Sequence, residues 1–170
     1  GATGGNIWFY SPGGILIGSG STFDVGGLVL TTNDINTISS TMSFSGDANS
    51  LSSVTIENGA TINAGNDRSS YVAIVAPRIV QGGTVNVNGS AAYVAAEEDN
   101  LTINNGLFDI AIGVGTTDAN GVVHSGTTTG ASSTPTFAGS NITDADAQAI
   151  YLVAVPKNDA LTMLVSGSLG

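Results

Sequence analysis

The chain has 170 residues and a net charge of −10, from three lysines or arginines and 13 aspartates or glutamates. Three cations are too few for the basic surface that attracts nucleic acid or an anionic membrane, and the lack of cysteine excludes disulfides, thiolate metal sites and cysteine nucleophiles. A mean hydropathy of +0.26 places the chain outside the disordered class, yet no apolar run reaches the roughly 20 residues of a membrane-spanning helix.

Three segments are almost continuously apolar and each ends at a proline: residues 6–12, 71–77 and 150–156. Proline lacks an amide hydrogen and therefore suits the end of a strand. An uninterrupted apolar strand is typical of burial on both faces. We expect these strands to line an interior on one side and to lie under an extra layer on the other. The aromatic residues 8–10 then face the core or a cap, rather than a sugar.

Short segments of one kind repeat along the chain. Residues 60–64, 83–87 and 106–110 begin 23 residues apart, and a fourth copy at 21–25 begins 39 residues before the first of them. A longer match relates residues 54–59 to residues 101–106. A period in the low twenties is the length of one coil in a parallel β-solenoid, in which each coil bonds to its neighbours.

Within each copy the third and fifth residues are apolar and the residue between them is polar, as expected of a strand with one face inside. Asn63, Asn86 and Asp109 occupy the polar position and are predicted to stack outside, coil above coil. Asparagine stacked on asparagine can form a hydrogen-bonded ladder. Asp109, and Asp24 in the copy at 21–25, would end such a ladder rather than extend it.

Residues 115–140 are rich in Gly, Thr and Ser and break the rhythm of the strands. We interpret them as an excursion from the coils, either a long loop or a small hairpin around Val122 and Val123, with a disordered linker as the alternative. His124, the single histidine, is expected to be exposed there. The strand pattern resumes at Ile150, so one domain is predicted over 1–170, with coils in 1–114 and 141–170.

Few residues are candidates for chemistry. Asp67 and Arg68 are adjacent in a turn, residues 97–99 form a compact acidic run, and Asp144 and Asp146 could share one face of a strand and hold calcium. No third element ties any of these groups together, and such runs are usually solvated turn charges. We therefore expect no catalytic, cofactor-binding or metal-binding residue, with calcium at Asp144 and Asp146 as the alternative.

The stretch YSPGGILIGSGSTFDVGGLVLTTNDI, residues 10–35, resembles the secretion domain of filamentous haemagglutinin-like exoproteins of two-partner secretion. Residues 72–80, 91–97 and 101–110 look like later coils of that family, so the resemblance covers about residues 7 to 110. The family's Asn-Pro-Asn turn is Ser-Pro-Gly here. The positions assigned to the family motif are Ser11, Pro12, Gly13, Gly14, Ile15, Gly18, Val25, Gly26, Gly27 and Leu28, with Ser11 and Gly13 as the departures.

The resemblance implies a right-handed parallel β-helix in a piece of a larger exoprotein of a Gram-negative bacterium. It implies Sec export, passage through an outer-membrane transporter of the two-partner type, and a place outside the cell or on its surface. The expected role is a non-enzymatic scaffold for adhesion or for extracellular filaments. Copies of the chain, stacked end to end, are expected as further partners. The sequence does not identify a host or surface glycan or receptor. A carbohydrate-binding or carbohydrate-active β-helix, similar to polysaccharide lyases or hydrolases, is the alternative.

Overall fold

The computed structural model describes residues 5–65, 69–104, 106–130, 149–157 and 163–170. Their regular structure is all β, and most of it belongs to three parallel sheets with five strands from the coils in each. Sheet A contains β1 (Asn6–Tyr10), β4 (Gly27–Thr31), β9 (Tyr71–Ala76), the start of β12 (Ser90–Asn104) and β16 (Ile150–Ala154). Sheet B contains β2 (Ile15–Ile17), β7 (Ser53–Ile56), β10 (Arg78–Gln81), β14 (Val122–His124) and β17 (Leu164–Val165). Sheet C contains β3 (Thr22–Val25), β8 (Thr61–Ala64), β11 (Thr84–Val87), β15 (Thr127–Thr129) and β18 (Ser168–Leu169).

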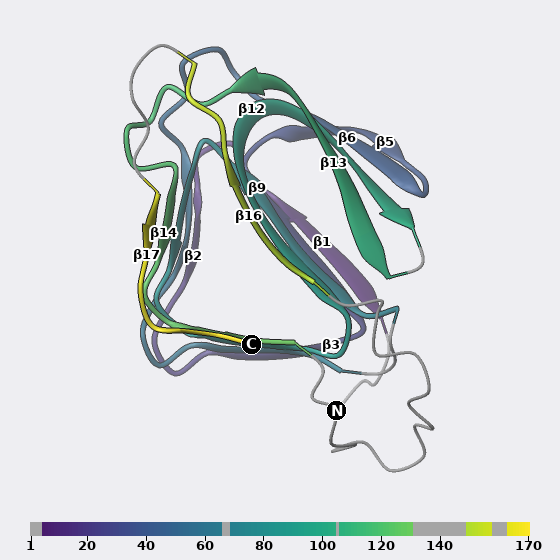
Figure 1. The fold of residues 1–170 in the computed structure, drawn as a ribbon, viewed down its shortest axis with the longest axis vertical. Coiled ribbons are helices and arrows are strands. Elements are labelled where there is room, and N and C mark those ends of the chain that lie inside the picture. The colour runs from purple at the N-terminus through teal and green to yellow at the C-terminus, as the bar shows by residue number, and fades with distance from the viewer. Residues whose placement is uncertain (1–4, 66–68, 105, 131–148, 158–162) are drawn as a thin grey trace.

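The chain visits the three sheets in turn, and each visit adds one strand beside the strand of the previous coil. Viewed down the stack, sheets B, C and A form the walls of a triangle (Figure 1). The expectation of an all-β fold made of stacked parallel coils is therefore confirmed.

The predicted repeat holds for three coils and then fails. Thr22 pairs with Thr61, 39 residues later, and Thr61 pairs with Thr84, 23 residues later, as the repeat requires. The next partner of Thr84 is Thr127, 43 residues later. Residues 106–110 are not in this sheet at all. They belong to β13 (Leu107–Gly115), which runs antiparallel to β12.

The interior of the triangle is filled by alternate side chains of the three sheets, including the apolar positions of the repeat copies at 60–64 and 83–87. Ile62 and Val85 of sheet C, Val54 and Ile79 of sheet B, and Ile74 of sheet A are all fully buried in one continuous cluster. Branched aliphatic side chains suit both a strand conformation and dense packing. Burial of this cluster is the main favourable term for coil stacking.

A second layer covers the outer face of sheet A. It is a four-stranded antiparallel sheet, sheet D, built from β5 (Asp34–Ile38), β6 (Thr41–Ser45), the end of β12 and β13. Met42, Phe44 and Leu101 of sheet D pack with Ala73 and Val94 of sheet A. Figure 1 shows this sheet outside the triangle. The strand β9 and the start of β12, in the middle of sheet A, are thus buried on both faces, which explains why residues 71–77 are continuously apolar.

The predicted excursion at 115–140 requires correction. Residues 122–124 and 127–129 are strands of sheets B and C, so this segment supplies the fourth coil. The detour from the coils lies earlier, in the end of β12 and in β13. Residues 131–140 lie outside the described residues.

Candidate functional site

The residues that carry the family resemblance build the first coil. Ser11, Pro12, Gly13 and Gly14 form the turn from sheet A to sheet B, closed by the Gly14 amide donating to the Ser11 carbonyl at 3.1 Å. Gly14 has a φ of +115°, which a residue with a side chain rarely adopts. Ile15 then begins β2, and Gly18 follows that strand.

The second half of the motif makes the turn from sheet C to sheet A and begins a strand that is closely flanked within sheet A. Val25 ends β3, and Gly27 and Leu28 begin β4 after Gly26. A Cβ atom on Gly27 would lie 2.7 Å from the Asn6 side-chain oxygen and 2.7 Å from the Tyr71 ring. The structure therefore explains why glycine is required at positions 14 and 27: the first has a positive φ, and the second has no room for a side chain. Recognition of this coil by a transporter stays a prediction.

The outer face of sheet C carries a ladder of polar side chains. The Asn86 amide donates to the Asn63 side-chain oxygen at 2.9 Å, and the Asn63 amide donates to the Asp24 carboxylate at 2.8 Å. Asp24 accepts and cannot donate, so the chain of bonds ends there. Asp109 is not part of the ladder. It lies in β13 opposite Thr102, and Thr129 is the neighbour of Asn86 in the next coil.

Asn63→Asp is expected to lower the free energy of unfolding by about 1 kcal/mol, because it removes the donor to Asp24 and sets two carboxylates side by side on neighbouring strands. Urea unfolding at low and high salt measures this. The loss should shrink in high salt, which screens exposed like charges. Asn86→Asp is the control, because Asn86 donates to the uncharged side-chain oxygen of Asn63 in this ladder and its loss should depend less on salt. Equal salt dependence of the two variants would contradict the ladder.

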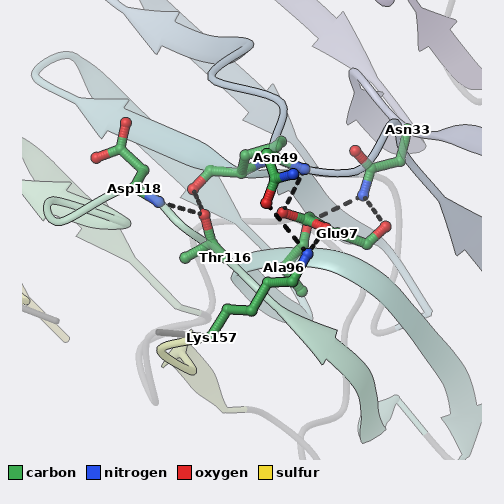
Figure 2. A network of polar contacts seen from close by, with 8 residues as sticks. Asn33, Asn49, Ala96, Glu97, Thr116, Asp118 and Lys157 are labelled. Carbon is green, nitrogen blue, oxygen red and sulfur yellow. Dashed lines mark hydrogen bonds and ion pairs between the residues drawn. The ribbon is translucent and has the colours of Figure 1, made fainter. Parts of the chain in front are cut away.

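A buried ion pair lies where β12 leaves sheet A for sheet D. Lys157 Nζ is 2.8 Å from Glu97 Oε2, and the two side chains are 28% and 3% exposed. The Asn49 amide donates to Glu97 Oε1 at 2.9 Å, and Lys157 also reaches the Asn49 side-chain oxygen at 3.4 Å. Figure 2 shows these three side chains converging from different segments of the chain. The pair ties the residues after β16 to β12, and the bonds of Asn49 add the insertion that contains β5 and β6.

The backbone at the same corner is also fully used. Asn33, which follows β4, donates its side-chain amide to the carbonyls of Ala96 and Glu97 at 3.0 and 3.1 Å (Figure 2). The Gly46 amide donates to the same Glu97 carbonyl at 2.7 Å. These bonds satisfy the carbonyls where β12 departs from regular pairing between Ala96 and Asp99.

The acidic run at 97–99 was expected to be solvated, and this is wrong for two of its three residues. Glu97 and Asp99 are buried, and only Glu98 is exposed. Asp99 lies opposite Phe44 of β6 and Ile112 of β13, and neither carboxyl oxygen has a hydrogen-bond partner among the described residues. Burial raises the pKa of Asp99 to about 8.

His124 is fully buried inside the fourth coil, which corrects the expectation of an exposed loop histidine. Its Nδ1 lies 3.1 Å from the Ser166 carbonyl oxygen, which can only accept, so Nδ1 carries the hydrogen. In the neutral ring Nε2 then accepts from the Thr128 hydroxyl at 2.8 Å. Thr128 in turn accepts from the Tyr93 hydroxyl at 2.7 Å. The chain of bonds joins all three sheets in the interior.

No group of three or more histidine, aspartate or glutamate side chains that could hold a metal occurs among the described residues. The same part of the chain contains no helix long and apolar enough to cross a membrane. Four candidates of the sequence analysis lie outside the described residues: Asp67, Arg68, Asp144 and Asp146. The calcium site considered at Asp144 and Asp146 is therefore not tested by the structure.

The buried polar groups could not be found from sequence. Lys157 lies in no motif, and His124, Thr128 and Gln81 alternate with small or apolar residues as exposed residues also do. Gln81 shows the difficulty, because its side-chain amide donates to the carbonyls of Gly83 and Thr127 at 3.1 Å each inside the stack. No protein-family model matches the chain, and no curated protein matches it.

Proposed function

We propose that the chain is a scaffold segment of an exoprotein secreted by the two-partner route. It is folded as a right-handed parallel β-helix in which a coil without insertions has about 23 residues. Its role is mechanical: it presents and extends a surface outside the cell for adhesion or matrix formation. It performs no covalent chemistry.

The observation that carries the proposal is that several polar side chains form hydrogen bonds between the coils and segments of the stack. Asn63 and Asn86 bond to the coil before them, Glu97 is held between three segments, and His124 is bonded inside. In a catalytic site we would expect such groups to converge on an open groove instead. Here they bond one coil or segment of the stack to another, as a scaffold requires.

Secretion by the two-partner route is supported by the first coil and by composition. The motif from Ser11 to Leu28 forms one continuous coil at one end of the stack. The turn from Ser11 to Gly14 belongs to this end coil. A chain that crosses an outer-membrane pore unfolded is helped by having no disulfide, and this chain has no cysteine.

An export assay tests the proposal. The chain, preceded by a Sec signal, is produced in a Gram-negative host with and without a two-partner transporter, and the fraction outside the cell is measured. We expect export only with the transporter. Ser11→Asn/Gly13→Asn restores the family's Asn-Pro-Asn turn and should increase the exported fraction.

Gly130→Asn is the matched control, because neither Gly13 nor Gly130 has a described atom within 4 Å of the position of a Cβ atom and neither has a positive φ. It should leave export unchanged. Release that does not depend on the transporter would refute the two-partner assignment, and equal export of all three proteins would refute a role of the Ser-Pro-Gly turn in export.

A further inference from the structure

A carboxyl group without a hydrogen-bond partner is buried between sheet A and sheet D. Asp99 lies in β12 between Phe44 of β6 and Ile112 of β13, and it is 2% exposed. It shares a face of its strand with Leu101, which packs in the cluster between the two sheets. Both carboxyl oxygens of Asp99 are buried and unpaired among the described residues. Such surroundings favour the protonated group, because an unpaired carboxylate loses its hydration without compensation.

The described strands packed around Asp99 contribute no cation to this site. Their titratable groups are acids and phenols: Glu97 and Glu98 of β12, Asp34 of β5, Asp109 of β13, and Tyr10, Tyr71 and Tyr151 of sheet A. None of these groups can neutralise a carboxylate, and the ammonium group of Lys157 is already paired with Glu97. Burial is therefore what raises the pKa of Asp99 to about 8.

Sheet D packs on the coil stack through a core of its own. The buried cluster between the two sheets includes Met42 and Phe44 of sheet D and Val75 and Val94 of sheet A. The cluster inside the triangle shares no residue with it. Figure 1 shows sheet D as an outer layer, outside the walls of the triangle. Sheet D can therefore separate from sheet A while the interior of the triangle stays packed.

We propose that sheet D is a cover that stays closed on sheet A while Asp99 holds its proton and lifts when that proton is lost to solvent. The carboxylate left behind has no partner in the closed layer, and it regains its hydration when the cover lifts. The corner where Asn33 binds the carbonyls of Ala96 and Glu97 keeps the cover attached to the stack. Opening exposes the outer apolar face of sheet A, while the three walls of the triangle remain stacked.

The direction of the pH dependence follows from the two states of the cover. In the closed state Asp99 keeps its proton up to a pKa of about 8, whereas in the open state the hydrated carboxyl group loses it near the ordinary pKa of 3.8. The closed state therefore binds more protons between about pH 4 and pH 8. The ratio of open to closed chains should rise about tenfold per pH unit in this window and level off above it.

Thiol labelling measures the opening, because the chain has no cysteine of its own. Ala73→Cys places a thiol on the outer face of sheet A, under the cover, and Ala91→Cys places one on the inner face of the same sheet. Both alanines are fully buried, so the two sites form a matched pair. Dividing each labelling rate by that of the same chain unfolded in urea removes the pH dependence of the thiol itself.

The Ala73→Cys thiol should react faster than the Ala91→Cys thiol, and its relative rate should rise about tenfold per pH unit between about pH 5 and pH 8. Adding Asp99→Asn should abolish this rise, because an amide does not ionise. Asp99→Leu is a second background, without a polar atom at the site, and should do the same. Glu98→Gln changes the exposed neighbouring acid and should leave the rise as it is.

Equal labelling of the two thiols at every pH would overturn the proposal, because sheet D would then not separate from the stack by itself. A relative rate for Ala73→Cys that does not depend on pH would also overturn it, and so would an equal rise with Asp99 replaced. Either result would mean that the proton on Asp99 does not hold the cover. Circular dichroism melting of each variant confirms that the coils remain folded.

Discussion

Replacing Asp99 with asparagine is expected to raise the free energy of unfolding at neutral pH and to remove most of its pH dependence between about pH 4 and pH 8. Burial raises the pKa of the folded carboxyl group to about 8, whereas the unfolded group loses its proton near its ordinary pKa of 3.8. Between these values the folded state binds more protons. Its stability therefore falls as pH rises, by up to about 1.4 kcal/mol per pH unit.

Urea unfolding at pH 5, 6, 7 and 8 measures this dependence. Glu98→Gln is the control, since Glu98 is the neighbouring acid on the same strand and is exposed. It should retain the slope of the unmodified protein, whereas Asp99→Asn should lose it. A flat profile in the unmodified protein would mean that the Asp99 carboxyl group reaches water or a partner in solution.

The alternation of apolar and polar residues predicted the strands of the coils but not always their sheet. Residues 60–64 and 83–87 stack as expected, while residues 106–110 show the same alternation and lie in sheet D. The reason is physical, because β13 also buries one face, against sheet A rather than inside the triangle. Period-two patterning reports a half-buried strand and does not report which layer buries it.

The continuously apolar segments were more informative. Residues 71–77 predicted burial on both faces, and the structure supplies sheet D as the second cover. The hairpin of β5 and β6 could not be placed from sequence, because the long interval between 21–25 and 60–64 indicates an insertion without indicating where it folds.

The charged residues of the sequence were predicted to be exposed, and this prediction is wrong at the acidic run 97–99. Burial alternates along β12 from Glu97 onward, as in a strand with one covered face, so Glu97 and Asp99 are buried while Glu98 is not. The cation that neutralises Glu97 is 60 residues away in the sequence. Such a pairing depends on the stacking of the last coil, which no local pattern encodes.

Lys157→Met is expected to lower the free energy of unfolding by about 3 kcal/mol, because it leaves the Glu97 carboxylate buried with one backbone donor. Glu97→Gln should cost much less. Its amide keeps an oxygen for the Asn49 amide, and the Lys157 side chain, 28% exposed, can return its ammonium group to water. Urea unfolding of both variants at pH 7 measures the difference.

The double variant Glu97→Gln/Lys157→Met decides what the pair contributes. If the cost of Lys157→Met is that of an unpaired buried charge, the double variant should recover most of the lost stability, although it has no ion pair. If it instead loses as much as Lys157→Met, the attraction itself stabilises the corner. Lys157 lies in the last coil, and Glu97 lies where β12 leaves sheet A. Recovery of stability in the double variant would therefore mean that the pair determines where the last coil docks and adds little to the stability of the stack.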